Sequence, residues 1–174
     1  MPEDAAAILQ IDRSFSTDTI FTAYCDTHQM GIRLTPTDST VTKSFPLEDL
    51  SQEDRPWELA VVAVDGDEIC GFLAAGYQAW NRRLTLWHLY VDSACRGRGI
   101  ARLLVDRAQA YAIEKGAVHL WLEASNLNVP AIAMYRKLGF ALCGMDTTLY
   151  QGTPASAETA LFLARPVAGF ESLT

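Results

Sequence analysis

The apolar positions of the chain change their period near its middle. Residues 84–91 are almost continuously apolar, which predicts a strand buried within a sheet. A short hinge at 92–95 and a turn rich in glycine and arginine follow. Apolar residues then recur every three or four positions, which predicts an amphipathic helix of about four turns. We expect its apolar face to carry Ile100, Leu103, Leu104, Ala108 and Tyr111, and its end to lie at Gly116.

The rest of the chain predicts hairpins, further strands and two short helices. Segments 20–24 and 30–35 flank a polar turn, and segments 59–64 and 69–77 flank Asp65-Gly66-Asp67, which is typical of hairpins. Further strands are expected at 118–123, 140–145 and 161–165, and helices at 3–12 and 130–138. This order predicts an α/β fold in which a central mixed, twisted sheet has helices on both faces.

Two segments are expected to lack regular structure. Residues 14–19 are rich in turn and cap residues. Residues 36–56 carry three prolines and an acidic run of Glu48, Asp49, Glu53 and Asp54, which predicts a mobile acidic loop. We therefore expect a single domain over residues 1–174, with a variable part at 1–56 and the core at 57–166.

The composition narrows the class of partner. The chain has 174 residues, 49% of them hydrophobic, which is sufficient for a substantial core. Its net charge of −7 argues against nucleic acid as the main partner and favours a cationic small molecule.

Metal and membrane partners are not expected. The four cysteines are scattered without a C-x-x-C pair, and the three histidines, His28, His88 and His119, have no metal-ligand spacing with them. The acidic start, Met1-Pro2-Glu3-Asp4, is unlike a signal peptide, and no apolar run reaches the roughly 18 residues of a membrane span. We expect a cytoplasmic protein without a metal.

The turn between the central strand and its helix is suited to phosphate. The first turn of a helix presents backbone N–H groups at the positive end of the helix dipole. Glycines such as Gly97 and Gly99 allow an anion to approach the backbone closely, and Arg96 and Arg98 add positive charge. The P-loop and dinucleotide patterns are both absent. From this loop alone, an alternative interpretation is an arginine-rich surface turn that only caps a helix.

Two motifs supply that context. Arg96, Gly99 and Ala101 fit the pattern [Q/R]-x-x-G-x-[G/A], and the segment from Asn128 to Phe140 fits N-x-x-A-x-x-x-Y-x-x-x-G-F. Each motif follows a predicted strand, and the two occur in the order and at the spacing found in the GNAT acetyltransferases, which the chain therefore resembles.

The resemblance implies an enzyme that uses acetyl-CoA. The acyl group would pass directly to an amine in a ternary complex. Tyr135 would protonate the leaving thiolate, and the backbone of Val91 would bind the pantetheine and the acetyl carbonyl. The residues implied in cofactor binding are Tyr90, Val91, Arg96, Gly97, Arg98, Gly99, Ile100, Ala101, Asn128 and Tyr135. Family members also make a homodimer plausible. From the residues alone, Tyr135 could equally be a core aromatic on a helix.

Segments outside these motifs resemble the streptothricin (nourseothricin) acetyltransferases. They are residues 14–21, 80–85, 119–123, 144–150 and 158–162. The resemblance implies acetylation of the β-lysine amine of streptothricin, which inactivates the antibiotic. In those enzymes the central strand usually carries a Glu-Asp pair, where this chain has Trp87-His88. Another amine, in an aminoglycoside, a polyamine or a peptide, therefore stays open. A non-catalytic module that binds acyl-CoA is a further alternative, which the presence of Tyr135 and Asn128 disfavours.

The reaction requires a base and a site for a cation. A lysine-like ammonium has a pKa of about 10.4 and must lose a proton before it can attack a thioester. Glu123, at the end of a strand, and His88 are the candidate bases. Acceptor-binding candidates are Asp18, Tyr77, Trp80, Glu123 and Tyr150. Each also has a structural alternative, as a core aromatic, a cap or a solvated polar residue.

Overall fold

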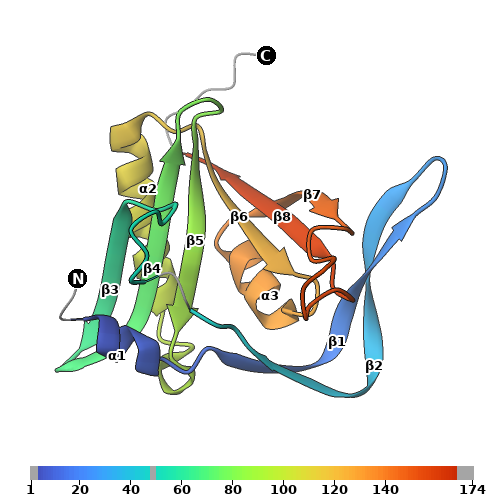
Figure 1. The fold of residues 1–174 in the computed structure, drawn as a ribbon, viewed down its shortest axis with the longest axis horizontal. Coiled ribbons are helices and arrows are strands. Elements are labelled where there is room, and N and C mark those ends of the chain that lie inside the picture. The colour runs from blue at the N-terminus through green and yellow to red at the C-terminus, as the bar shows by residue number, and fades with distance from the viewer. Residues whose placement is uncertain (1–3, 48–49, 168–174) are drawn as a thin grey trace. The chain divides into compact units, whose positions relative to one another are not determined.

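The computed structural model describes residues 4–47 and 50–167 (Figure 1). Its helices are α1 (Ala5–Gln10), η1 (Ser93–Cys95, a 3-10 helix), α2 (Ile100–Lys115) and α3 (Val129–Lys137). Its strands are β1 (Ser14–Cys25), β2 (Met30–Ser44), β3 (Leu59–Asp65), β4 (Glu68–Gln78), β5 (Arg83–Val91), β6 (His119–Ser125), β7 (Ala141–Asp146) and β8 (Ala160–Pro166).

The strands form two sheets. β1 and β2 pair with each other, and the remaining strands form a six-stranded sheet in the order β3-β4-β5-β6-β8-β7. β3–β4, β4–β5 and β7–β8 are antiparallel pairs and β5–β6 is a parallel pair, so the sheet is mixed, as predicted. The described residues divide into two compact units, one made of 4–14, 44–122 and 165–167 and the other of 15–43 and 123–164.

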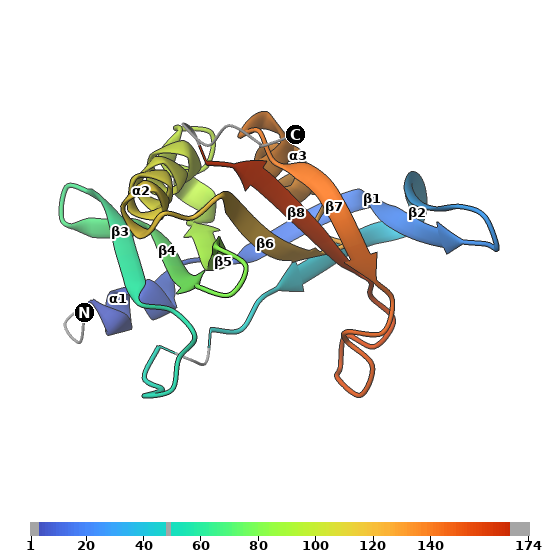
Figure 2. The same cartoon turned by 90° about the horizontal axis from the view of Figure 1, so that it is seen from above.

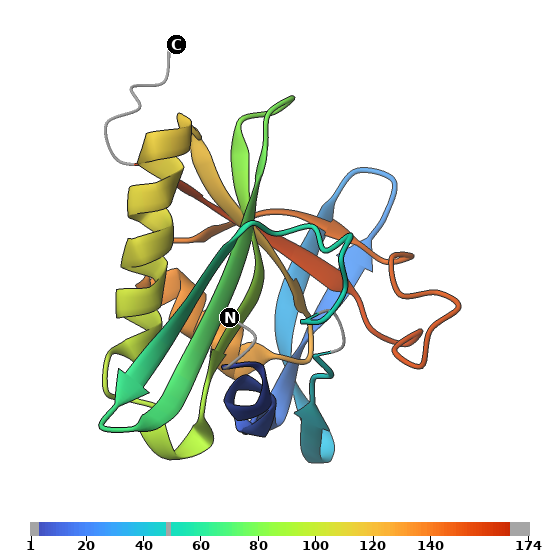
Figure 3. The same cartoon turned by 60° about the vertical axis from the view of Figure 1, so that its left-hand side comes forward.

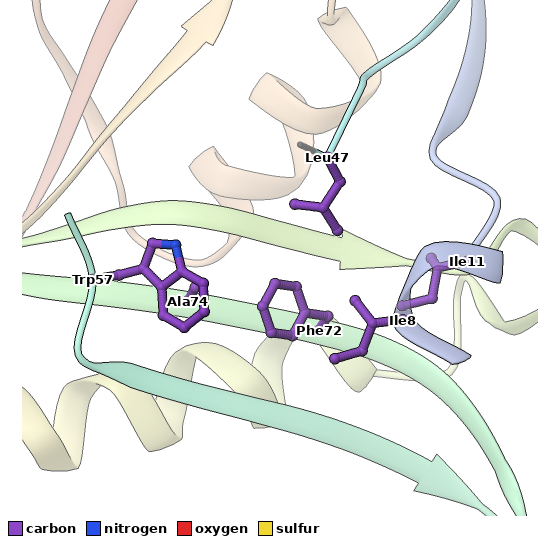
Figure 4. Close-up of a cluster of buried hydrophobic side chains, with 6 residues drawn as sticks. All are labelled: Ile8, Ile11, Leu47, Trp57, Phe72 and Ala74. Carbon is purple, nitrogen blue, oxygen red and sulfur yellow. The ribbon is translucent and has the colours of Figure 1, made fainter. Parts of the chain in front are cut away.

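In the first unit, β4 lies between two hydrophobic layers. Phe72 and Ala74 point to one face, where they pack in a buried cluster with Ile8, Ile11, Leu47 and Trp57 (Figure 4). Gly71 points to the other face, where a Cβ would lie 3.0 Å from Ile100 and 3.1 Å from Leu104 of α2. Successive strand residues point to opposite faces, so α1 and α2 cover opposite faces of this part of the sheet (Figure 3).

The predicted central helix is confirmed as α2. Gly99 before it and Gly116 after it have φ angles of 83° and 69°, a left-handed conformation that glycine adopts without strain. The buried residues are Ile100, Leu104, Val105, Ala108 and Ala112. The prediction for Leu103 is wrong, since its side chain is 63% exposed. At about 100° per residue, Leu103 lies about 140° around the helix from Ala108, the middle of the buried face.

In the second unit, the N-terminal hairpin is longer than its apolar segments predict. The turn at 26–29 is confirmed, and the Asp26 carboxylate accepts hydrogen bonds from the N–H groups of His28 and Gln29, each 2.8 Å long. The predicted irregular structure at 14–19 and 36–44 is wrong, because these residues belong to β1 and β2. Cross-strand hydrogen bonds between polar side chains support them: Ser16 with Thr42 (2.9 Å), Asp18 with Thr40 (2.6 Å) and Thr22 with Thr35 (3.1 Å). Glu48 and Asp49 lie outside the described residues.

The remainder of the second unit contains α3 and the antiparallel pair of β7 and β8, which a long loop connects (Figure 2). α3 begins after Asn128, whose side chain accepts a hydrogen bond from the N–H of Ala131, and Pro130 stands in its first turn, as predicted. The buried side chain of Asn126 donates to the carbonyl of Phe21 (2.6 Å) and accepts from the N–H of Thr159 (2.8 Å). This amide therefore joins β1 to the segment that leads into β8.

Candidate active site

The loop between β5 and α2 has the open backbone that an anion would need. Asp92 caps η1 by accepting a hydrogen bond from the N–H of Ala94 at 3.0 Å. Gly97 and Gly99 have φ angles of 78° and 83°, and a Cβ at either position would meet no atom within 4 Å. The two glycines thus expose the backbone at the start of α2, where the positive end of the helix dipole lies.

The two arginines of this loop have different partners. Arg96 donates to three main-chain carbonyls, those of Val91, Asp12 and Ser14. Arg98 instead forms a salt bridge of 2.8 Å with Asp65, in which both side chains are more than half exposed. Asp65 raises the pKa of Arg98 through this hydrogen bond and its charge. Both arginines were predicted to act at the pyrophosphate. The guanidinium of Arg98 binds the exposed side chain of another residue, whereas that of Arg96 binds main-chain carbonyls.

The central strand separates from its parallel neighbour before its end. Within the described residues, β5 is in register with β6 only from Arg83 to Thr85, opposite His119 to Trp121. Beyond Thr85 it stays in register with β4 as far as Val91, where it meets Gly71. The register with β4 shifts between Leu86 and His88, so Trp87 lies in a bulge. The last part of β5 therefore forms no continuous ladder with β6. The family resemblance implies that the backbone of this part, at Val91, binds the cofactor.

His88 lies in an aromatic stack. Its ring is nearly parallel to those of Phe72 and Tyr90, with centroid distances of 6.1 Å and 5.7 Å. Its Nδ1 lies 3.3 Å from the hydroxyl of Tyr90, and the edge of Trp57 packs against it. Trp87 is 43% exposed. These contacts are those of a packed histidine.

Glu123 lies in a cluster of polar side chains that the second unit brings together from distant parts of the chain. The hydroxyl of Tyr150 donates a hydrogen bond to Glu123. Lys43 binds both carboxylate oxygens of Glu158, at 2.5 Å and 2.6 Å, and the hydroxyl of Ser125 donates to the same carboxylate. The charge of Lys43 and that of Glu158 both act on Glu123. We call these five residues, Lys43, Glu123, Ser125, Tyr150 and Glu158, the carboxylate cluster.

Burial changes the acidity of the cluster. It raises the pKa of Glu123, against the opposing effects of the Tyr150 hydrogen bond and the charge of Lys43. Burial and the adjacent Glu123 also raise the pKa of Tyr150 far above its usual range, so the phenol stays protonated as a hydrogen-bond donor. Glu123 is therefore a carboxylate with increased proton affinity, which is the property required of a general base that works near neutral pH.

The residues of the second motif lie on α3. Tyr135 is buried and packs edge-to-face against Phe140, with a centroid distance of 5.8 Å and an interplanar angle of 63°. Asn128 uses its Oδ1 to cap the helix, at 3.2 Å from the N–H of Ala131.

Comparison with known proteins decides the family. Residues 23–140 match the acetyltransferase (GNAT) family. The streptothricin acetyltransferase of Streptomyces lavendulae is 42% identical over 173 residues, which cover 95% of this chain and 91% of that protein. The chain belongs to the GNAT acetyltransferase family. The crystal structure of nourseothricin acetyltransferase superposes with a TM-score of 0.87 at 42% identity, over 96% of this chain and 95% of that one. A Bacillus anthracis protein crystallised with acetyl coenzyme A, 24% identical, shares the fold with a TM-score of 0.79, over 97% of this chain and 94% of that one.

Membership of this family confirms the predicted α/β GNAT fold and an acetyl-CoA-dependent N-acetyltransferase. It disfavours the non-catalytic module. The division into two units does not test the prediction of one domain over residues 1–174, which stays a prediction.

The predicted acceptor residues of the acetyltransferase divide between the two units. Asp18, Glu123 and Tyr150 belong to the second unit, whereas Tyr77 and Trp80 belong to the first. Trp80 is 86% exposed in the turn between β4 and β5. This turn precedes β5, whereas the glycine loop follows it. Lys43, Ser125 and Glu158 were not predicted. Glu158 lies in a segment that resembles the streptothricin enzymes, but Lys43 is 115 residues away from it and no local pattern links them.

Across residues 4–47 and 50–167, no three His, Cys, Asp or Glu side chains are grouped so that they could hold a metal ion. The helices in the same part of the chain are all too short or too polar to cross a membrane.

Proposed function

We propose that this acetyltransferase transfers the acetyl group of acetyl-CoA to the β-lysine amine of streptothricin and so inactivates the antibiotic. The observation that carries the proposal is the 42% identity to a streptothricin acetyltransferase across 95% of the chain. Because the identity extends along almost the whole length, it includes the parts of the chain outside the cofactor motifs. The carboxylate cluster, with its buried acidic side chains, is suited to a cationic acceptor.

On the donor side, the backbone of residues 97–101 would hold the pyrophosphate, assisted by Arg98. The open approach to Gly97 and Gly99 supports this role. The backbone of Val91, next to Tyr90, lies beyond the β5–β6 ladder, and it would bind the pantetheine and donate to the acetyl oxygen as negative charge develops. Asn128 would contact the pantetheine arm.

On the acceptor side, the charge of the carboxylate cluster favours an ammonium. Glu158 is neutralised by Lys43, with side chains 10% and 24% exposed, while the hydrogen-bond donor to Glu123 within the described part of the chain is the neutral phenol of Tyr150. A substrate cation would balance the charge of Glu123. We assign Glu123, rather than His88, as the base, because the contacts of His88 are with aromatic rings.

The chemical step requires three proton transfers around one displacement. Glu123 takes a proton from the ammonium, directly or through one water, and the free amine attacks the thioester carbonyl carbon. The carbon–sulfur bond then breaks, the nitrogen loses a second proton to solvent as the amide forms, and Tyr135 protonates the leaving thiolate. The direct attack requires no acyl-enzyme and hence no nucleophilic side chain.

The proposal is tested by measuring CoA release from acetyl-CoA with streptothricin and, in parallel, with aminoglycosides, polyamines and lysine peptides. Acetylated streptothricin, identified by mass spectrometry at the β-lysine amine, is the expected product. Turnover of another amine with none of streptothricin would refute the acceptor and favour the alternative that Trp87-His88 leaves open. Absence of turnover with every amine would refute the whole proposal.

Two parts of the proposal concern the protein in the cell. We infer a cytoplasmic enzyme, where acetyl-CoA is available, and a homodimer, as the family resemblance implies. Light scattering after size-exclusion chromatography tests the dimer, and a mass equal to one chain would refute it. Fractionation of cells that carry the gene tests the location.

A further inference from the structure

Arg96 is the first residue of the glycine loop, but its side chain points to the protein backbone. Nε donates to the carbonyl of Val91 at 3.1 Å, and Nη2 donates to the carbonyls of Asp12 at 3.1 Å and Ser14 at 2.7 Å. These carbonyls belong to the end of β5, to the segment between α1 and β1, and to the first residue of β1, and the last two lie more than 80 residues before Arg96 in the chain. One edge of the guanidinium is thus fully used in joining two distant segments.

A second set of hydrogen bonds joins the same segments. The Asp92 carboxylate accepts from the N–H of Asp12 through Oδ2 at 2.9 Å and from the N–H of Ala94 through Oδ1 at 3.0 Å. The Asp12 carboxylate accepts from the N–H of Ser14 at 2.9 Å. Segment 12–14 therefore both donates to and accepts from the residues that follow β5. We call this set of hydrogen bonds among Asp12, Ser14, Val91, Asp92 and Arg96 the brace.

Arg98 makes a useful contrast within the same loop. Its only charged partner among the described residues is Asp65, in a pair where the side chains are 52% and 55% exposed. Exposed pairs of this kind contribute little and exchange readily. Arg98 can therefore turn to an incoming phosphate at small cost, whereas the Nε and Nη2 donors of Arg96 already bind three carbonyl groups.

We propose that Arg96 is a positioning residue, which fixes the end of β5 and the start of the loop against segment 12–14, and that it is not a ligand of the pyrophosphate. The inference rests on the proposed role of the loop in binding acetyl-CoA. Positive charge for the pyrophosphate then comes from Arg98 and the N–H groups of 97–101. Arginine suits position 96 because its planar fork reaches carbonyls in two directions, which the single ammonium of lysine does not match.

The first test compares two acetyl donors. Acetyl-CoA contains the pyrophosphate, and S-acetylpantetheine lacks it but keeps the reacting thioester. For a positioning residue, Arg96→Gln and Arg96→Lys both lower kcat/KM roughly tenfold with either donor, as the loss of about one net hydrogen bond would. Arg98→Gln is the matched control, and it should lower kcat/KM more with acetyl-CoA than with S-acetylpantetheine.

Two outcomes of this test would overturn the proposal. One is a loss confined to acetyl-CoA in Arg96→Gln together with wild-type rates in Arg96→Lys, because charge alone would then suffice. The other is unchanged kcat/KM for both Arg96 variants with both donors. Wild-type turnover with acetyl-CoA is measured first, since its absence would refute the proposed function and not the brace.

The second test uses the wild-type protein, so it does not depend on the folding of a variant. Hydrogen–deuterium exchange of the amides of Asp12 and Ser14 is followed without and with saturating CoA. If the brace persists in the complex, exchange stays equally slow or becomes slower. If Arg96 leaves the brace for the pyrophosphate, exchange at these amides becomes faster when CoA binds, and the proposal is wrong.

Discussion

Tyr150 donates its hydroxyl hydrogen bond to the carboxylate of Glu123, and both side chains are half-buried. The two residues come from the end of β6 and from the loop between β7 and β8. Their pairing holds a carboxylate in place beside a donor that stays protonated, because the pKa of Tyr150 is raised far above its normal range.

Glu123→Gln should abolish most activity without weakening the fold. As the base, Glu123 supplies roughly 10²- to 10⁴-fold in rate. Since its pKa is raised in the folded state, the folded protein binds this proton more tightly than the unfolded chain does. Stability therefore falls as pH rises from the unfolded to the folded pKa of Glu123. Glutamine avoids this cost, so melting scans should find the variant at least as stable as wild type at pH 8, with a smaller difference at pH 5. A variant that keeps full kcat would exclude Glu123 as the base.

Tyr150→Phe should move the acid limb of the activity profile to higher pH. The phenol hydrogen bond lowers the pKa of Glu123, so its removal allows burial to raise that pKa further. More alkaline solution is then needed to deprotonate the base. The measurement is kcat/KM against pH, and an acid limb at the wild-type position would contradict the link between the two residues. We also expect a loss of about 1 kcal/mol in the free energy of unfolding.

Lys43→Met should destabilise the protein by about 3 kcal/mol, because it leaves the carboxylate of Glu158, whose side chain is 10% exposed, without its cation. Lys115→Met is the control, since Lys115 pairs with Glu58 at 3.4 Å on the surface and should cost less than about 1 kcal/mol. Urea denaturation measures both. If the double variant Lys43→Met/Glu158→Gln is no more stable than Lys43→Met, the cost does not come from an unpaired carboxylate.

Gly99→Val should weaken acetyl-CoA binding beyond its effect on stability. The left-handed backbone at Gly99, with φ of 83°, costs any residue with a Cβ about 1–2 kcal/mol. Gly152 provides the matched control, because its φ is 84° and a Cβ there also meets nothing within 4 Å. Calorimetric titration with CoA should find a large loss of affinity for Gly99→Val and little for Gly152→Val. Equal affinities would remove the pyrophosphate from this loop.

Tyr135→Phe should lower kcat far more than it lowers CoA affinity. Phenylalanine keeps the edge-to-face packing on Phe140, so the buried ring stays in place and only the hydroxyl is lost. Tyr135→Ala, by contrast, should cost about 3–5 kcal/mol of stability as a large-to-small change in the core. Parallel losses of kcat and affinity in Tyr135→Phe would contradict its role as the acid.

The elements predicted well are those with local signals. The central strand and α2 follow from a continuous apolar run and from glycines at both ends of the helix, all within 84–116. β1 and β2 were predicted too short because their outer parts are rich in serine and threonine, which also favour turns. Cross-strand pairs such as Ser16 with Thr42 stabilise them, and such pairs are visible only once the register is known.

The proposed functional residues also differ in whether a local sequence signal predicts their contacts. Glu123 was predicted as a candidate base and Tyr150 as an acceptor-binding aromatic, but their direct contact was not predicted, and Lys43 was missed because its partner is 115 residues away. Arg96 was predicted to bind phosphate because its charge is obvious in the sequence. Its carbonyl partners, Asp12 and Ser14, depend on the tertiary path of the chain.

The way in which the chain divides has a consequence for its evolution. In the sequence, residues 15–43 lie between two segments of the first unit. The hairpin, which carries Asp18 and Lys43, therefore interrupts that unit as one continuous segment. Neither unit is a continuous gene segment, and no truncation could preserve one without the other. Recombination that replaces codons 15–43 as a cassette, however, would change residues on the acceptor side and leave the codons of the glycine loop intact. This short internal segment is therefore the natural unit for a directed-evolution library that varies the proposed acceptor residues.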